Sequence, residues 1–339
     1  MTGIDDAALL AVVAIASALG ASALPRASWP RRCPAAAILL WQALGLASGL
    51  AAVGTLIGLA LPASQGGLVL SVLRAAGLLR NGELFGLARV FGLGQADGAP
   101  LVLVLVAVRL ACLAAGLVLL ASLCWVLLAA SVAALQARRR QRALLTLLAH
   151  GDPKVPGALV VDYPSAAAYC LPGLRSRSRI VVSVGALELL GRGELAAVLA
   201  HERAHLRERH DLVLLPFTAL ARAFPWSVLV QRSYASVALL VEMLADDHAA
   251  RQRPARELVT ALIRVGAAGT PGSPAGTLAV ADEDGAEAGG RAEGESGVTA
   301  RVERLLTPAP GLCLAARILV GSTAAVLVVV PAALLVMPL

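Results

Sequence analysis

The sequence has little charge and few aromatic residues. Of its 339 residues, 15% are Asp, Glu, Lys or Arg and 3% are Phe, Trp or Tyr, whereas 58% are hydrophobic. A soluble globular domain carries about 25% charged residues, so this balance excludes an ordinary soluble protein and indicates a membrane protein. The apolar runs consist mostly of Ala, Leu, Val and Gly, which is typical of closely packed membrane helices.

Paired cysteines and nucleic-acid-binding motifs are also missing. No CxxC pair occurs among the five cysteines, which excludes a cysteine-based metal site and a disulfide framework. They are Cys33, Cys112, Cys124, Cys170 and Cys313, and we expect all five to be free thiols. The formal charge of +7 comes largely from arginines beside apolar runs. We therefore expect no direct nucleic-acid binding.

Long hydrophobic runs, in contrast, are present. A helix needs about 20 apolar residues to cross a bilayer. Four stretches meet this length, at 7–24, 35–61, 100–135 and 312–337. Asp5 and Asp6 precede the first stretch, where a signal peptide carries Lys or Arg. The first stretch is therefore predicted to be an anchor, and the chain to be embedded in the lipid bilayer.

Arginine-rich flanks predict the orientation of these spans. Arg31 and Arg32 follow the first stretch, and Arg138–Arg140 follow the third. Because basic residues favour the cytoplasmic side, we expect a multi-pass cell-membrane protein with both termini outside and the region after the third span in the cytoplasm. Residues 66–93 alternate apolar and basic positions, which predicts an interfacial amphipathic segment on the outer face.

The region between the third and fourth spans has its own organisation. Short β-branched segments at Val155–Asp162 and Arg179–Val184 predict strands, and helical patterns follow them, so 136–265 is expected to form a cytoplasmic α+β domain. Residues 266–300 are rich in Gly, Ala and acidic residues and are predicted to be a disordered loop. The remainder, 301–339, is predicted to be a short helix and the C-terminal span.

The segment Val198–Asp211 reads VLAHERAHLRERHD and contains the motif HExxH. On a helix, positions i and i+4 share one face, so His201 and His205 can reach one metal ion with Glu202 beside them. Zinc suits this pattern, because three protein ligands leave a fourth position for a water whose pKa falls to about 7. The pattern predicts one Zn²⁺ per chain and Glu202 as the catalytic general base.

Two residues are candidates for the third ligand. Asp211 lies six positions after His205, but the intervening Glu208 is a good helix former, so we expect the helix to continue and carry Asp211 past the metal. Glu242 belongs to a second predicted helix reading VEMLADDHAA. Glu242 is the favoured third ligand, and Asp211 is left as a candidate for hydrogen bonding around the site.

Three further residues lie close in sequence to the predicted ligands, and each receives a predicted role. Asp246 stands one turn beyond Glu242, where it can accept a hydrogen bond from a ligand imidazole and fix its tautomer. His210 is predicted to lie off the metal-facing side, as a surface or capping residue. His248 is also predicted to be a surface or capping residue. Its alternative role is stabilisation of the transition-state oxyanion.

The residues around the motif resemble a known family. HERAHLRERHD followed by VEMLADDHAA is similar to the integral-membrane zinc metallopeptidases of the BlaR/MecR type, and the same core occurs in Ste/HtpX-type peptidases. Upstream, VVDYP, AYCLPG and RIVVS match the strand, turn and second strand of that family. The resemblance covers roughly 136–262 and, more loosely, the layout of four spans.

The resemblance implies a gluzincin, with His201, His205 and Glu242 as zinc ligands and Glu202 as the base. It also implies that the Ala168–Gly173 segment lies near the substrate, where an extended peptide can pair with a strand edge. The penicillin-sensor domain that follows the last span of the antibiotic sensors is expected to be lacking here. By analogy, the substrate is a cytosolic transcriptional repressor or the protein itself.

The predicted fold is a mainly α membrane protein with about four transmembrane helices and an α+β HExxH zinc-metallopeptidase domain between helices three and four. The predicted function is a zinc-dependent endopeptidase that cleaves a protein or peptide at the cytoplasmic membrane surface. Two alternatives stay open. One is a catalytically silent signalling or scaffold protein. The other is a site-2-type intramembrane protease, which would bury HExxH within a span.

Overall fold

The computed structural model describes residues 3–61, 67–83, 100–152, 155–173, 178–268, 289–307 and 310–336. The chain divides into two compact units. The first contains residues 1–27, 36–126 and 313–339, and the second contains residues 28–35 and 127–312. One helix, α6 (Pro100–Leu148), has residues in both units.

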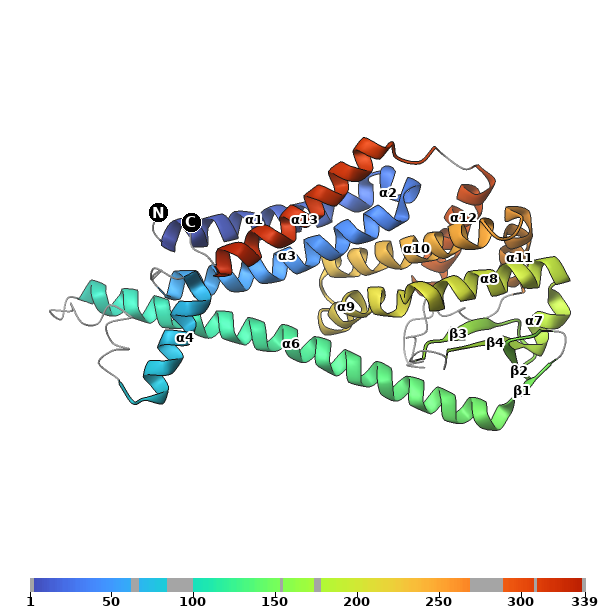
Figure 1. Ribbon diagram of the computed structural model, residues 1–339, viewed down its shortest axis with the longest axis horizontal. Coiled ribbons are helices and arrows are strands. Elements are labelled where there is room, and N and C mark those ends of the chain that lie inside the picture. The colour runs from blue at the N-terminus through green and yellow to red at the C-terminus, as the bar shows by residue number, and fades with distance from the viewer. Residues whose placement is uncertain are drawn as a thin grey trace. The chain divides into compact units, whose positions relative to one another are not determined.

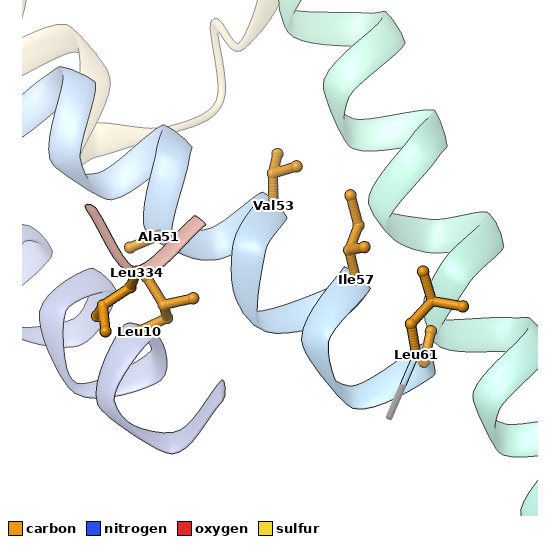
Figure 2. Close-up of a cluster of buried hydrophobic side chains, with 7 residues drawn as sticks. Leu10, Ala51, Val53, Ile57, Leu61 and Leu334 are labelled. Atoms are coloured by element: carbon orange, nitrogen blue, oxygen red, sulfur yellow. The ribbon is translucent and has the colours of Figure 1, made fainter. Parts of the chain in front are cut away.

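The first unit is built from long apolar helices. They are α1 (Gly3–Ala23), α3 (Pro34–Ala60), α4 (Gly67–Arg80), the first half of α6 and α13 (Leu314–Val336), with the short 3-10 turn η1 (Leu24–Arg26) after α1 (Figure 1). Leu10 of α1 and Leu334 of α13 pack beside Ala51 of α3 (Figure 2). Val53 and Ile57 extend this buried cluster along α3. The buried members of this cluster are all aliphatic.

The outward faces of these helices are equally apolar. Val12, Ile15 and Leu19 on α1 are exposed, as are Val326 and Val329 on α13. Exposed aliphatic side chains in such numbers are unfavourable in water and are the normal surface of a helix in lipid. The first unit thus has the surface of a membrane-embedded bundle.

Among the described residues, five helices are long and apolar enough to cross a membrane. Four of them, at Asp6–Arg26, Pro34–Ala60, Val104–Leu148 and Leu314–Val336, coincide with the four predicted stretches. The fifth is α10 (Val228–Ala250), which the sequence analysis did not count. The third helix continues beyond the predicted end at 135 to Leu148, because the basic segment after the apolar run also favours a helix.

The second unit combines a small sheet with helices. Its strands are β1 (Ala149–Gly151), β2 (Ala158–Val161), β3 (Ala168–Leu171) and β4 (Arg179–Ser183), in the order β1-β2-β4-β3. β2 and β4 are parallel, and β3 is antiparallel to β4. The helices are α2 (Trp29–Arg32), α7 (Val184–Leu189), α8 (Arg192–Glu208), α9 (His210–Ala223), α10, α11 (Ala255–Ala267) and α12 (Gly289–Leu306).

Within this unit α8 lies between the sheet and α10 (Figure 1). One face of the sheet packs on α7 and α8 through Ile180, Val182 and Leu199. The link from β4 to α7 is tight, since a Cβ on Gly185 would lie 2.0 Å from the carbonyl oxygen of Pro164. Glu194 accepts a hydrogen bond from the N–H of Gly191 and so caps the start of α8. The sheet and α10 hold α8 from two sides.

Three predictions need correction or restriction. The helix carrying HExxH was expected to continue through Glu208, but α8 ends there, and Arg209 adopts a left-handed conformation (φ 55°) before α9 begins. Residues 289–300 were assigned to a disordered loop and instead form the first turns of α12, which packs on α10 and α11. Residues 269–288 lie outside the described residues. The predicted amphipathic segment 66–93 is helical over Gly67–Arg80, and 84–93 lie outside the described residues.

Candidate metal centre

The two histidines of HExxH share one face of α8, as their spacing predicts. The Nε2 atoms of His201 and His205 lie 3.1 Å apart, and both side chains are buried. Glu242 enters from α10, with Oε2 3.3 Å from Nε2 of His201 and Oε1 3.5 Å from Nε2 of His205. The structure therefore brings the three predicted ligands to one point.

This arrangement can be tested against the metal that the motif implies. A tetrahedral zinc ion with bonds of about 2.0–2.1 Å places its ligand atoms about 3.3 Å from one another. The three separations of 3.1, 3.3 and 3.5 Å bracket that value. One ligand atom from each of the three residues can be chosen so that all lie within 4.8 Å of one another. Two neutral imidazoles and one carboxylate are a common zinc donor set, so the residues fit Zn²⁺.

Asp246 occupies the position predicted for it. Its Oδ1 lies 2.9 Å from Nδ1 of His201, and its side chain is almost fully buried. A carboxylate that holds the Nδ1 proton leaves the Nε2 lone pair of the imidazole directed at the metal position. Asp246 thus lies against the ring nitrogen of His201 that faces away from Glu242.

Arg301 is a member of the site that the sequence analysis missed. Its Nε and Nη2 donate to the two carboxylate oxygens of Asp246 at 2.8 and 2.7 Å. Its Nη1 also lies 3.1 Å from Oε2 of Glu242. Arg301 was placed in the short helix before the last span, and no local spacing links it to HExxH. One guanidinium therefore compensates the buried carboxylate of Asp246 and the partly buried carboxylate of Glu242.

Glu202 lies next to the candidate ligands and is partly buried. Burial raises the pKa of the Glu202 carboxyl to about 7, against the opposing effect of a charged His201. The thiol of Cys170 on β3 interacts with the same carboxyl, which raises the pKa of the thiol. A carboxyl whose pKa is close to neutrality is suited to exchange protons during a reaction. The predicted base is thus held between the motif helix and strand β3.

The two ligand histidines differ in protonation in the metal-free chain. Burial disfavours the charged form of His201, yet hydrogen bonds from its ring to Asp246 and Glu242 raise its pKa to about 10. Burial lowers the pKa of His205 to about 4. The centre therefore stabilises one positive charge between carboxylates, which is the electrostatic environment that a cation requires.

The remaining predicted residues lie around the centre. Asp211 does not join the three ligands, and its Oδ2 pairs with Nη2 of Arg138 at 2.7 Å. His248 contacts Glu208 through Nε2 and lies 2.9 Å from the carbonyl oxygen of Leu244 through Nδ1. These partners place both residues in interhelical contacts.

His210 was predicted to be a surface or capping histidine, and this is wrong. Its side chain is 2% exposed, and its Nδ1 lies 3.0 Å from Nδ1 of His205. The prediction assumed that the helix continues, whereas the left-handed Arg209 turns His210 back toward the motif. The residues before His210 are charged and favour a helix, so the local sequence does not predict that the chain turns back at Arg209.

Residues 133–263 match the sequence profile of Peptidase family M48. The matched stretch contains His201, Glu202, His205 and Glu242, and it supports an M48-type metallopeptidase domain. Peptidases of this family are typically zinc-dependent. Arg301 lies beyond the end of the match. No solved structure matches the chain.

Proposed function

We propose that this chain is a membrane-embedded zinc endopeptidase of the BlaR/MecR type, with its active site at the cytoplasmic membrane surface. The observation that carries the proposal is the convergence of His201, His205 and Glu242 beside a partly buried Glu202. The match to Peptidase family M48 supports the same reaction class.

In this proposal His201, His205 and Glu242 hold the ion. Bound zinc supplies a water of lowered pKa and polarises the carbonyl of the scissile peptide bond. Glu202 accepts the proton of that water and delivers it to the leaving amine. Because burial raises its pKa to about 7, this carboxyl is suited to both accept and release a proton near neutral pH.

The substrate is proposed to be an extended segment of a protein. β3 is an edge strand in the order of the described strands, so the backbone groups on one side of it are available for pairing with another strand. β3 packs against α8, so the strand lies beside the helix that carries Glu202. A peptide added to β3 would therefore run past the reacting groups. A cytosolic repressor or a second segment of this chain fits this description.

The location at the cytoplasmic surface rests on two features. Arg138–Arg140 follow the apolar part of α6, and basic flanks favour the cytoplasm. Among the described helices, α8 is not one of the five that can span a membrane. A site-2-type protease buries HExxH within a span, so this placement favours a surface-facing centre. α10 meets the length criterion, yet its last turns carry Glu242, Asp246 and Asp247, which are costly in lipid.

The test uses the full chain purified in detergent. The wild type is expected to contain about one zinc ion per chain and to cleave casein or itself. Glu202→Gln should retain the metal and lose cleavage, whereas Glu188→Gln, on the exposed side of α7, should change neither. Zinc retention by a wild type that cleaves no substrate would instead favour a scaffold function.

The third ligand is tested separately. Glu242→Ala should abolish zinc binding, and Asp211→Ala should leave the zinc content unchanged because Asp211 pairs with Arg138. The reverse result would show that the metal is held by Asp211 and that the proposed ligand set is incorrect.

A further inference from the structure

A row of buried polar contacts begins at Nδ1 of His205, the ring nitrogen that faces away from His201 and Glu242. The proposed peptidase reaction does not use these contacts. His210, the first residue of α9, places Nδ1 3.0 Å from Nδ1 of His205. The two rings are nearly perpendicular, at 89°, with their centroids 4.7 Å apart. This edge-on arrangement points one ring nitrogen directly at the other.

The tautomers of both rings follow from their neighbours. Nε2 of His205 faces His201 and Glu242, so its lone pair is needed at the metal position and the ring proton resides on Nδ1. Nδ1 of His210 must then be the acceptor. The proton of His210 resides on Nε2, which lies 3.4 Å from Oε2 of Glu208. Donor and acceptor roles therefore alternate along this row of contacts.

Glu208 connects this row of contacts to the helix that supplies the third ligand. While Oε2 faces His210, Oε1 contacts Nε2 of His248 on α10. The other nitrogen of His248 faces the carbonyl oxygen of Leu244. The carboxylate is thus held at two points, one on α9 and one on α10. The Glu208 carboxylate faces His210 at ion-pair distance, as that of Asp246 faces His201.

We propose that His210 is a positioning residue for the metal centre, which accepts the Nδ1 proton of His205 and takes its own orientation from Glu208. This inference rests on the proposed zinc site. The two ligand histidines then differ in their support, because His201 is backed by a carboxylate and His205 by a neutral imidazole. Partners of this kind are worth roughly 10- to 100-fold in metal affinity.

The test compares two substitutions by the affinity of the full chain for zinc alone, measured by competition with a chromophoric chelator. In His210→Asn the amide oxygen takes the place of Nδ1 as an acceptor, whereas His210→Leu keeps the volume and removes the acceptor. We expect His210→Leu to weaken zinc binding roughly 10- to 100-fold and His210→Asn to remain within a few-fold of the wild type. His150→Leu, at an exposed position on β1, is the matched control.

The melting temperature of each metal-free protein separates positioning from packing. If His210→Leu binds zinc as tightly as the wild type, or if both variants lose affinity in parallel with their metal-free stability, the inference is overturned. Should His210→Leu fail to fold, the comparison of His210→Asn with Glu208→Gln decides, since only the latter is then expected to weaken zinc binding. A wild type without zinc would refute the proposed function itself, which is a different result.

Discussion

Arg301 and Asp246 form a two-point ion pair across 55 residues of sequence, with N–O separations of 2.8 and 2.7 Å. The Asp246 side chain is 1% exposed and that of Arg301 11%. Because Asp246 contacts the Nδ1 atom of His201, the pair links α12 to the orientation of a metal ligand.

Removal of the guanidinium should destabilise the second unit. Arg301→Met leaves the buried carboxylate of Asp246 without its cation, and loss of one partner of such a pair costs about 3–5 kcal/mol. Arg304→Met removes a more exposed partner of Asp247 and should cost less. Thermal denaturation of both variants measures the difference. Equal melting temperatures would show that the Arg301 pair is energetically unimportant.

Two adjacent carboxylates on α10 should differ in their effect on zinc. Asp246→Ala removes the acceptor behind His201 and should weaken zinc affinity roughly 10- to 100-fold. Asp247→Ala also deprives an arginine of its partner, but Asp247 pairs with Arg304 and not with a ligand histidine. Chelator competition on the two variants makes the comparison. The prediction is contradicted if both bind zinc equally well.

The end of strand β3 should depend on α6. The Nη2 group of Arg142 donates to the carbonyl oxygen of Pro172, which directly follows β3. A hydrogen bond from a charged group is worth about 1.5 kcal/mol, so Arg142→Met is expected to lower kcat/KM roughly tenfold, chiefly through KM. Zinc content should be unchanged. Arg140→Met, at an exposed position of the same helix, serves as the control in a peptide-cleavage assay.

The turn between β4 and α7 should not tolerate a side chain. A Cβ on Gly185 would lie 2.0 Å from the backbone oxygen of Pro164, which cannot rotate away. Gly185→Ala is therefore expected to lower the free energy of unfolding by about 3 kcal/mol. Nothing lies within 4 Å of a Cβ built on Gly151 in β1, so Gly151→Ala should be nearly neutral. Chemical denaturation distinguishes the two.

Local patterns in the sequence predicted which three residues converge, but only part of the contacts around them. His201 and His205 are four residues apart on one helix, and so are Glu242 and Asp246. Helical periodicity alone therefore predicts that the members of each pair share a face. The pairs formed by Arg301 with Asp246 and Arg138 with Asp211 join residues 55 and 73 positions apart. Such contacts depend on how helices pack, which spacing along the chain does not encode.

The end of α8 illustrates tertiary contacts overriding helix propensity. Arg209 is a good helix former, yet it adopts a positive φ that is unfavourable for a residue with a Cβ. The next two side chains compensate, since His210 reaches His205 and Asp211 reaches Arg138. The small and charged residues of 289–300 predicted a disordered loop, but these residues are helical. The helix to which they belong, α12, packs on α10 and α11.

The low reactivity of the Cys170 thiol allows the other cysteines to be used as labels for membrane topology. Burial and the nearby Glu202 raise the pKa of Cys170, so at neutral pH it stays protonated and resists maleimides. Cys33 and Cys313 directly precede the apolar helices α3 and α13. A membrane-impermeant maleimide applied to inverted vesicles, but not to intact cells, should modify these two thiols while proteolysis continues. The native cysteines can thus report on which leaflet each flank faces.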